Sequence, residues 1–247
     1  MPIKAISFDF WHTLFTEQPG AFLLYQDKRR SLLANALLSY RNFADAELER
    51  ACVVEAESHF MIWQEQHRTS LASERVGRIL THLEVGLPDE SVSELVVAFE
   101  ELLLEHPPIL IDGAQEVLKQ LSKRYRLGII SDVGFSPGRV LKQVLASHDL
   151  LHLFDSLVFS DEAGRAKPHL EVFERAARSL STDPSEMVHV GDLERTDIIG
   201  ARQAGYRAIR FTGITTMEEG ERTIADFVTD DLTDIPRLVG MLDGELE

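Results

Sequence analysis

The stretch that most constrains the fold is residues 3–14, where a run of apolar and small residues ends in an acid, Asp9. Apolar residues closed by a polar break predict a buried strand. In an open α/β sheet, such a strand brings its last side chain to the carboxyl edge, where these folds place their ligands. Burying an unpaired charge is costly, so a carboxylate at this edge needs a partner. We therefore expect Asp9 to face a cation, a ligand or both.

Composition argues against two classes of partner. The chain has 247 residues, of which 44% are hydrophobic and 27% charged, as in globular proteins with a real core. Its formal net charge of −16 argues against nucleic acid or an anionic membrane surface as the partner. No apolar run approaches the roughly 18 to 20 residues of a membrane helix, and no signal peptide is recognised before Asp9. We expect a cytoplasmic protein.

The region between the first strand and residue 106 is helical in pattern. Apolar residues recur with the helical period from about 21 to 105, and almost nothing there has the pattern of a strand. The pair Pro107-Pro108 cannot continue a helix and predicts a hinge, with residues 16–20 as the other. We expect an all-helical cap domain over residues 17–106, inserted into a core formed by residues 1–16 and 107–247.

Strand and helix patterns alternate after the second hinge. The predicted strands cover residues 126–131, 156–160, 187–191 and 207–211, and the predicted helices cover residues 112–125, 138–151, 168–180, 196–204 and 229–242. This alternation predicts an α/β core with a doubly wound, Rossmann-like parallel sheet that helices cover on both faces.

Polar residues close the predicted core strands. Ser131, Ser160 and Asp192 each follow an apolar run, and Lys167 stands directly before a proline at the start of a helix. A strand needs no acid or hydroxyl at its end for stability. Several such residues together with Asp9 therefore indicate a site at this edge of the sheet.

Four segments stand in a set order along the chain. They are Phe8-Asp9-Phe10-Trp11-His12-Thr13-Leu14, Ile129-Ile130-Ser131-Asp132, Lys167-Pro168 and Val190-Gly191-Asp192-Leu193-Glu194-Arg195-Thr196-Asp197. Together they resemble the four motifs of the haloacid dehalogenase-like hydrolase superfamily. The helical insert lies where that family has its cap, between the first two motifs. The resemblance covers almost the whole chain.

The resemblance implies a phosphatase that acts on a small phosphorylated metabolite through an aspartyl-phosphate intermediate at Asp9. A carboxylate can act as such a nucleophile, and the reaction depends mainly on positioning and electrostatics. Ser131, Lys167 and the backbone amides near Trp11 and Asp132 are then expected to bind the phosphoryl oxygens. Lys167 is counted with Asp9 among the catalytic residues.

The resemblance also implies a magnesium ion, which proteins hold with few carboxylates, waters and phosphate oxygens. The expected ligands are Asp9, Asp192 and the backbone carbonyl of Trp11. Asp197 is placed in the ligand shell or just behind it. Carboxylates facing one another would repel without a cation between them, so the acids of the fourth motif favour a metal.

Trp11 departs from the phosphatase pattern. Most phosphatases of the superfamily have an Asp there, which protonates the leaving oxygen, whereas indole has no acid–base function near neutral pH. The haloacid dehalogenases carry a Tyr, need no metal and lack the paired acids of the fourth motif. Two further interpretations stay open: a metal-independent 2-haloacid dehalogenase, and a catalytically weak member kept for binding or regulation. A third hypothesis is that His12 partly replaces the missing acid, because histidine titrates in the right range.

Overall fold

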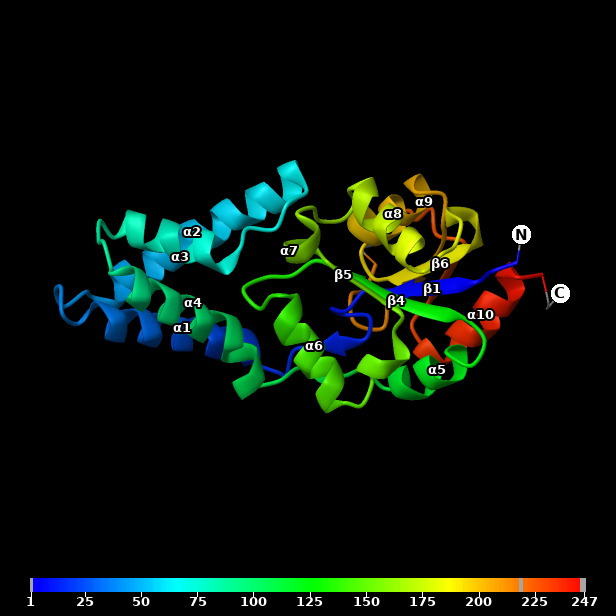
Figure 1. Cartoon of the computed structure of the whole chain (residues 1–247), viewed down its shortest axis with the longest axis horizontal. Helices are drawn as coiled ribbons and strands as arrows, with labels where there is room; N and C mark the ends of the chain where they lie inside the picture. Colours follow the sequence, from blue (N-terminus) through cyan, green and yellow to red (C-terminus); the bar gives the residue numbers. More distant parts are fainter. Residues whose placement is uncertain (1, 218–219, 245–247) are drawn as a thin grey trace. The chain divides into compact units, whose positions relative to one another are not determined.

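The computed structural model describes residues 2–217 and 220–244 (Figure 1). The chain forms two compact units. The first comprises Met1–Thr16, Ile109–Asp132 and Leu145–Glu247, and the second comprises Glu17–Pro108 and Val133–Val144. The described part of the chain holds no helix with the length and apolar character needed to cross a lipid bilayer.

The first unit is built on a six-stranded parallel sheet. Its strands are β1 (Ala5–Phe8), β4 (Arg126–Ser131), β5 (Ser156–Phe159), β6 (Met187–Gly191), β7 (Arg207–Phe211) and β8 (Phe227–Thr229). Their order is β5-β4-β1-β6-β7-β8, and every pairing is parallel. The chain runs from β1 to one side of the sheet and then to the other, so β1 lies at the switch point where such folds bind ligands.

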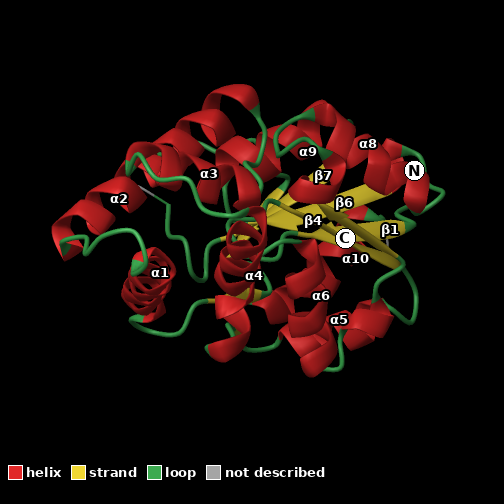
Figure 2. Cartoon of the chain, turned by 60° about the vertical axis from the view of Figure 1, so that its left-hand side comes forward, coloured by secondary structure: helices red, strands yellow, loops and turns green. Residues whose placement is uncertain are grey.

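Helices cover both faces of this sheet. They are α5 (Ala114–Leu121), α8 (Leu170–Ser179), α9 (Ile199–Gln203) and α10 (Ile235–Leu242). Figures 1 and 2 show α8 and α9 on one face and α5 and α10 on the other. Strands β1, β4 and β6 are almost fully buried because parallel strands covered on both faces meet no solvent, whereas the edge strand β8 is partly exposed. The predicted doubly wound α/β fold is confirmed.

Several short elements were not predicted. A two-stranded antiparallel sheet joins β2 (Phe15–Thr16) to β3 (Ile109–Leu110), at one of the predicted hinges and just beyond the other. The sixth strand, β8, precedes the last helix, whose first residue is Ile235 rather than Thr229. Elements of two or three residues hold at most one and a half periods of the two-residue alternation, which is too short for a sequence pattern to indicate them. The remaining short helices are α7 (Ser160–Ala163), η1 (Leu151–Leu153), η2 (Pro184–Glu186), η3 (Glu194–Ile198) and η4 (Leu232–Asp234).

The second unit is helical, as the insert was predicted to be. It contains α1 (Ala21–Leu37), α2 (Asp45–Gln66), α3 (Ala72–His82), α4 (Asp89–Glu105) and most of α6 (Gly138–Ser147). Its buried core includes Leu33, Leu37, Leu48, Ala51, Val76, Ile79 and Phe99. The segment Val133–Val144 groups with this unit although the residues on either side of it belong to the first. The role of residues 17–106 as a substrate cap stays a prediction.

Cys52 lies on α2 and is partly buried. Burial, followed by the neighbouring carboxylate of Glu55, raises the pKa of its thiol to about 11. Because the thiolate is the reactive form, the thiol is protected from alkylation and oxidation near neutral pH. Cys52 is therefore a packing residue and not a nucleophile.

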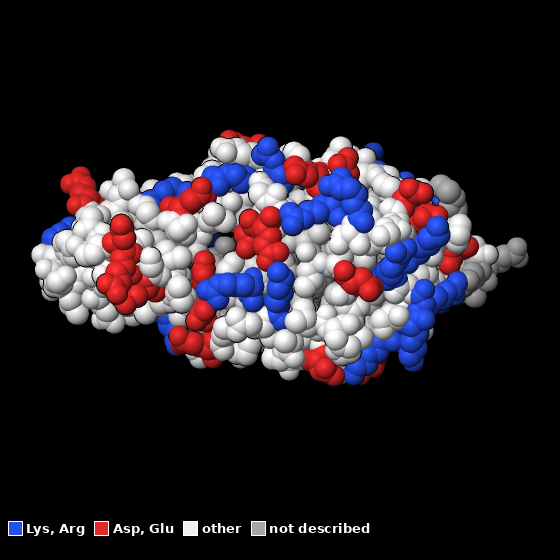
Figure 3. Space-filling view, in the orientation of Figure 1, with Lys and Arg blue, Asp and Glu red and all other residues white. Residues whose placement is uncertain are grey.

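Charges of both signs are interspersed on the surface. Figure 3 shows Lys and Arg side chains alternating with Asp and Glu on the face that it presents. That the chain does not bind nucleic acid stays a prediction from its net charge of −16.

Candidate active site

Strand register brings the ends of three strands to one level. Phe8, the last residue of β1, pairs with Ile129 of β4 on one side and with Val190 of β6 on the other. Asp9 therefore leaves the sheet beside Ser131 and Asp192. The buried register explains why residues far apart in the sequence meet at this edge.

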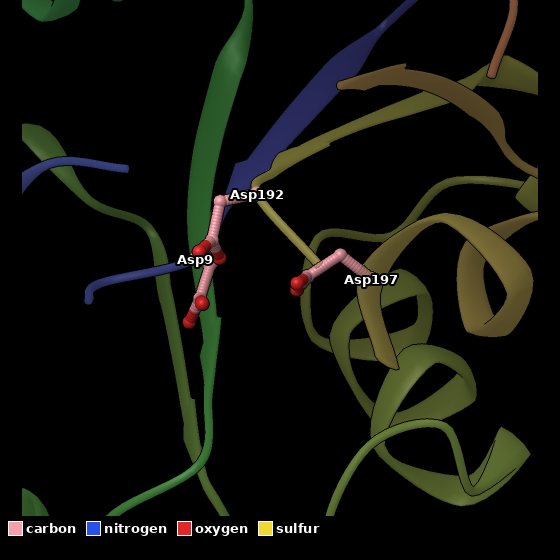
Figure 4. A group of neighbouring side chains, drawn as sticks. All are labelled: Asp9, Asp192 and Asp197. Atoms are coloured by element: carbon pink, nitrogen blue, oxygen red, sulfur yellow. The ribbon is translucent and has the colours of Figure 1, made fainter. Parts of the chain in front are cut away.

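Three buried carboxylates meet there (Figure 4). Asp9 follows β1, Asp192 follows β6, and Asp197 lies on η3, one turn after Asp192. One carboxylate oxygen from each residue lies within 4.8 Å of those of the other two. Opposite ligands in an octahedral magnesium site are about 4.2 Å apart, because each bond is about 2.1 Å long. The spacing is close to what one small cation requires.

Gly191 permits this approach. A Cβ atom on residue 191 would lie 2.4 Å from both Cβ and Cγ of Asp197, far inside van der Waals contact. Only glycine can therefore stand before Asp192 while Asp197 keeps its position. The Gly-Asp pair of the fourth motif thus has a steric reason in this chain.

Lys167 connects two of the acids. Its side chain is 2% exposed, and Nζ lies 2.8 Å from Oδ1 of Asp9 and 2.5 Å from Oδ1 of Asp197. Its main-chain N–H donates to Oδ1 of Asp132 at 2.9 Å, which fixes the backbone from which the side chain extends. Burial lowers the pKa of Lys167, but the charges of Asp197, Asp9 and Asp132 outweigh that effect and raise it. The raised pKa keeps the Lys167 ammonium charged at neutral pH.

Asp197 has donors on both of its oxygens. Oδ1 faces Lys167 Nζ and His189 Nε2, the latter at 3.1 Å. Oδ2 accepts the N–H of Leu193 at 3.0 Å and the hydroxyl of Thr196 at 3.2 Å. A carboxylate offers about four lone-pair positions, so these donors use its full capacity. Burial raises the pKa of Asp197, but Lys167 and His189 together reverse the effect and lower it.

His189 and Ser7 extend this network into the core. The His189 ring is fully buried on β6, and its Nδ1 lies 2.9 Å from the Ser7 hydroxyl on β1. Burial lowers the pKa of His189 despite the attraction of Asp197, so the ring is neutral. Nε2 then carries the proton, because a carboxylate can only accept. Sequence reasoning missed both residues; the only signal was a polar residue inside each of two apolar strands.

The negative charges of Asp9 and Asp192 are, by contrast, not fully balanced by positively charged neighbours. Both donors to Asp9 contact Oδ1: the N–H of Phe10 at 2.7 Å and Lys167. Burial, with the charges of Asp197 and Asp192, raises the pKa of Asp9 to about 8 although Lys167 opposes the shift. The pKa of Asp192 is raised by burial and by Asp197. Three carboxylates and one ammonium give a formal charge of −2, which one divalent cation neutralises.

The donor set fits magnesium. The candidate ligands are carboxylate oxygens, the type that this hard cation prefers, and their excess negative charge matches its own. Oδ2 of Asp192 accepts a hydrogen bond from the Thr215 hydroxyl at 2.6 Å, which orients the carboxylate and leaves Oδ1 for a ligand. Thr215 was not predicted, because it lies in a loop 23 residues after Asp192 and carries no motif of its own.

The predicted substrate-binding residues differ in their contacts with the three acids. Ser131 is buried at the end of β4, and its hydroxyl donates to the carbonyl of Asp132 at 3.1 Å. The Trp11 ring packs edge-on against Phe10, with ring centroids 5.1 Å apart, and is partly exposed. Among these residues only Lys167 forms an ion pair with Asp9 through its side chain, and Asp132 accepts the main-chain N–H of Lys167.

His12 adopts a left-handed backbone conformation, with φ of 54°. Glycine adopts this conformation readily, whereas other residues pay roughly 1 kcal/mol or more. Its Nδ1 lies 3.7 Å from Oδ2 of Asp192 and 3.4 Å from the Thr215 hydroxyl. The ring thus lies beside Asp192 and Thr215.

Comparison with known proteins agrees with this geometry. The family model of haloacid dehalogenase-like hydrolases matches residues 3–205. The chain belongs to this family. It is therefore a hydrolase, and the predicted family resemblance is confirmed.

Curated relatives of this hydrolase include phosphatases. It is 42% identical over 90 residues to a glyceraldehyde 3-phosphate phosphatase of Methanothermobacter thermautotrophicus, over 36% of this chain and 38% of the relative. It is 31% identical to a validoxylamine A 7′-phosphate phosphatase of Streptomyces hygroscopicus subsp. limoneus, over 59% of this chain and 67% of the relative. The matches to the glyceraldehyde 3-phosphate phosphatases of M. thermautotrophicus, Pyrococcus furiosus and Pyrococcus abyssi span 38%, 55% and 42% of those proteins.

Solved structures resemble the hydrolase over nearly its full length. A 2-haloacid dehalogenase from Pseudomonas syringae pv. Tomato DC3000 is 25% identical with a TM-score of 0.74, covering 97% of this chain and 99% of the other. A phosphatase of the same family from Thermococcus onnurineus is 22% identical with a TM-score of 0.70, covering 96% and 98%. The second likeness shows the fold alone.

Proposed function

We propose that this hydrolase is a magnesium-dependent phosphatase that acts on a small phosphorylated metabolite through an aspartyl-phosphate at Asp9. The observation that carries the proposal is the meeting of three buried carboxylates with a single lysine. That arrangement leaves a formal charge of −2 and raises the pKa of Asp9 to about 8, as expected for a site that binds a divalent cation. The phosphatases among its relatives support the same reaction class.

Each site residue has its own proposed role in phosphoryl transfer. The Phe10 N–H and Lys167 hold Oδ1 of Asp9, which leaves Oδ2 to attack phosphorus. The new Oδ2–P bond forms as the bond to the ester oxygen breaks, and water then hydrolyses the acyl phosphate and restores Asp9. Charge spreads over the phosphoryl oxygens during transfer, and Lys167 with the Ser131 hydroxyl would stabilise it.

Asp9, Asp192 and the carbonyl of Trp11 are the proposed magnesium ligands. The ion would supply Lewis-acid stabilisation of the phosphoryl oxygens and bring the substrate to Asp9. The four donors on Asp197 support a position behind the ligand shell, from which it holds Lys167. Asp197 then serves as a positioning residue that acts through the lysine.

Magnesium should stabilise the folded protein through Asp192. At a concentration 100 times its Kd, the ion should raise the free energy of unfolding by about 2.7 kcal/mol. Asp192→Asn should lose most of this increase, because it removes one ligand and one negative charge. Thermal unfolding with and without magnesium measures it. Asp149→Asn is the control, since Asp149 is 83% exposed and lies in a left-handed conformation that Asn tolerates. If magnesium stabilises Asp192→Asn as much as the wild type, Asp192 is not a magnesium ligand.

A metal-independent 2-haloacid dehalogenase is the second candidate. Trp11 favours it, because halide departs without a proton, and so does the likeness to the P. syringae dehalogenase. The unbalanced negative charge at Asp9 and Asp192 weighs against it, since a metal-free reaction leaves that charge uncompensated. The phosphatase is the better supported of the two.

Restoring an acid at position 11 should increase phosphatase activity. Trp11→Asp should raise kcat on a simple alkyl phosphate by about 100-fold, the lower end of what a general acid contributes. The gain should be much smaller on p-nitrophenyl phosphate, whose leaving group needs no proton. Trp11→Asn has the same size without the acid and is the matched control. Equal rates for the two variants would show that the proton donor is not limiting.

Removing the His12 ring tests whether it replaces that acid. His12→Asn keeps a residue that tolerates the left-handed backbone but removes the titratable group. We expect kcat on an alkyl phosphate to fall at least about tenfold, with loss of one limb of the pH profile. Steady-state kinetics across the pH range measures both. Unchanged activity and an unchanged profile would leave His12 without a catalytic role.

A further inference from the structure

The second unit contains a cluster of three arginines that faces one carboxylate. Arg29 of α1 and Arg75 and Arg78 of α3 all interact electrostatically with Glu55 of α2 or bind it directly. Two positive charges are therefore in excess at this place, in a chain whose net charge is −16.

Glu55 is fully engaged by two of these arginines. Its two oxygens accept Nε and Nη2 of Arg75, each at 2.8 Å, in a bidentate ion pair. Oε1 also accepts Nη2 of Arg78 at 2.9 Å. Glu55 is 2% exposed, so this buried pair is well formed. No oxygen of Glu55 bonds to Arg29.

Arg29 has aromatic neighbours in place of an anion. Its guanidinium carbon lies 4.3 Å from the centroid of the Phe135 ring, and that of Arg75 lies 3.5 Å from the same centroid. The Nε of Arg29 is buried without a hydrogen-bond partner. Among the described residues no carboxylate forms an ion pair with Arg29. The Phe135 ring thus contacts the positively charged guanidinium groups of both Arg29 and Arg75, and of the two only Arg75 forms an ion pair with a described carboxylate.

This environment is unfavourable for the free guanidinium. Burial, followed by the positive charge of Arg75, lowers the pKa of Arg29 to about 10. The Nδ1 of His59 and the Nε of Arg78 are also buried without partners. His59 follows Glu55 by four residues, on the same face of α2. Buried polar groups are normally satisfied, and several unsatisfied ones around one carboxylate indicate a missing partner.

The missing partner must be an acceptor with negative charge. A guanidinium presents a planar fork of N–H donors that matches a carboxylate or phosphate and suits chloride poorly. Phe135 would hold the fork in place by stacking, so little side-chain freedom would be lost on binding.

We propose that Arg29 is the principal ligand of an oxyanion-binding site in the second unit, which takes the phosphate or carboxylate group of a small molecule. All the residues that form it belong to the second unit, and the proposal does not depend on the proposed phosphatase activity. Arg29 would then be kept for binding, at the expense of the stability of the ligand-free fold.

The local test follows the Arg29 Nε–H signal by NMR in the full chain, in chelator-containing buffer. That signal is identified as the one absent from Arg29→Met. We expect inorganic phosphate to shift it saturably, with acetate titrated separately to distinguish the two oxyanions. Chloride at equal ionic strength should leave it in place. A signal that ignores both oxyanions, or follows chloride equally, would overturn the proposal.

The second measurement is thermal unfolding of the same variants. Arg29→Met should raise Tm in anion-free buffer, because it removes a half-buried charge that has no ion-pair partner in the described part of the chain, and should bind phosphate at this site at least about tenfold more weakly. Arg30→Met is the matched control, since Arg30 is the next residue of α1 but pairs with Asp27 at 2.5 Å. A lower Tm for Arg29→Met in anion-free buffer would show that Arg29 is structural, and would contradict the proposal whether or not the protein is a phosphatase.

Discussion

Asp9→Asn should abolish turnover, with a fall in kcat of at least about 10⁴-fold, because the amide cannot form the covalent intermediate. The substitution keeps the shape of the side chain and an oxygen for the Phe10 N–H and Lys167. Binding of substrate should survive, so the loss should fall on kcat and not on KM. Single-turnover phosphate release measures the effect.

The stability of this variant separates chemistry from folding. Burial and the neighbouring acids raise the pKa of Asp9 to about 8, so its ionised form is disfavoured in the metal-free fold. The free energy of unfolding of metal-free Asp9→Asn should therefore equal or exceed that of the wild type. Asp149→Asn should retain full activity. An Asp9→Asn enzyme that turns over like an active wild type would exclude Asp9 as the nucleophile, whereas no turnover by either protein would favour a binding role for the chain.

Lys167→Met should damage both activity and stability. The ammonium lies between Asp9 and Asp197, and its loss leaves two buried carboxylates without a cation. Breaking a buried ion pair from one side costs about 3–5 kcal/mol. We expect a fall of about 1,000-fold in kcat as well, because the charge that faces the phosphoryl oxygens is gone. Urea unfolding and steady-state kinetics measure the two effects.

Two variants control this experiment. Lys4→Met removes an exposed lysine that pairs with Glu186 at 2.7 Å, and surface pairs of this kind contribute about 0–1 kcal/mol. The double variant Lys167→Met/Asp9→Asn should recover part of the lost stability, since one uncompensated carboxylate becomes neutral. If Lys167→Met is no less stable than Lys4→Met, the network around Asp197 does not depend on the lysine.

The sequence predicted strand bounds most accurately for strands that helices cover on both faces. The strands at Arg126–Ser131, Met187–Gly191 and Arg207–Phe211 were predicted to the residue, because parallel strands covered on both faces read as continuous apolar runs. The helix predicted over residues 196–204 begins instead as a π-helix over Glu194–Ile198, in which the N–H of Ile198 reaches the carbonyl of Leu193. Hydrophobic periodicity does not distinguish this wider turn from an α-helical turn. The wider turn places the Asp197 side chain against the backbone of Gly191.

The site was predicted where a motif marks it. Asp9, Lys167, Asp192 and Asp197 were assigned from their segments, and the structure brings these four side chains together. Two of the partners that hold them, His189 and Thr215, belong to no motif. His189 reads as one residue of an apolar strand, and Thr215 as one residue of a polar loop. Their roles depend on strand register and loop packing, which exist only in the folded chain.

The most direct test of the account measures phosphate and halide release side by side. One sample receives an alkyl phosphate and the other a 2-haloacid, each with magnesium and with chelator. We expect the protein to release phosphate only in magnesium, and to release no halide in either buffer. Halide release that persists in chelator, without phosphate release in magnesium, would contradict this expectation.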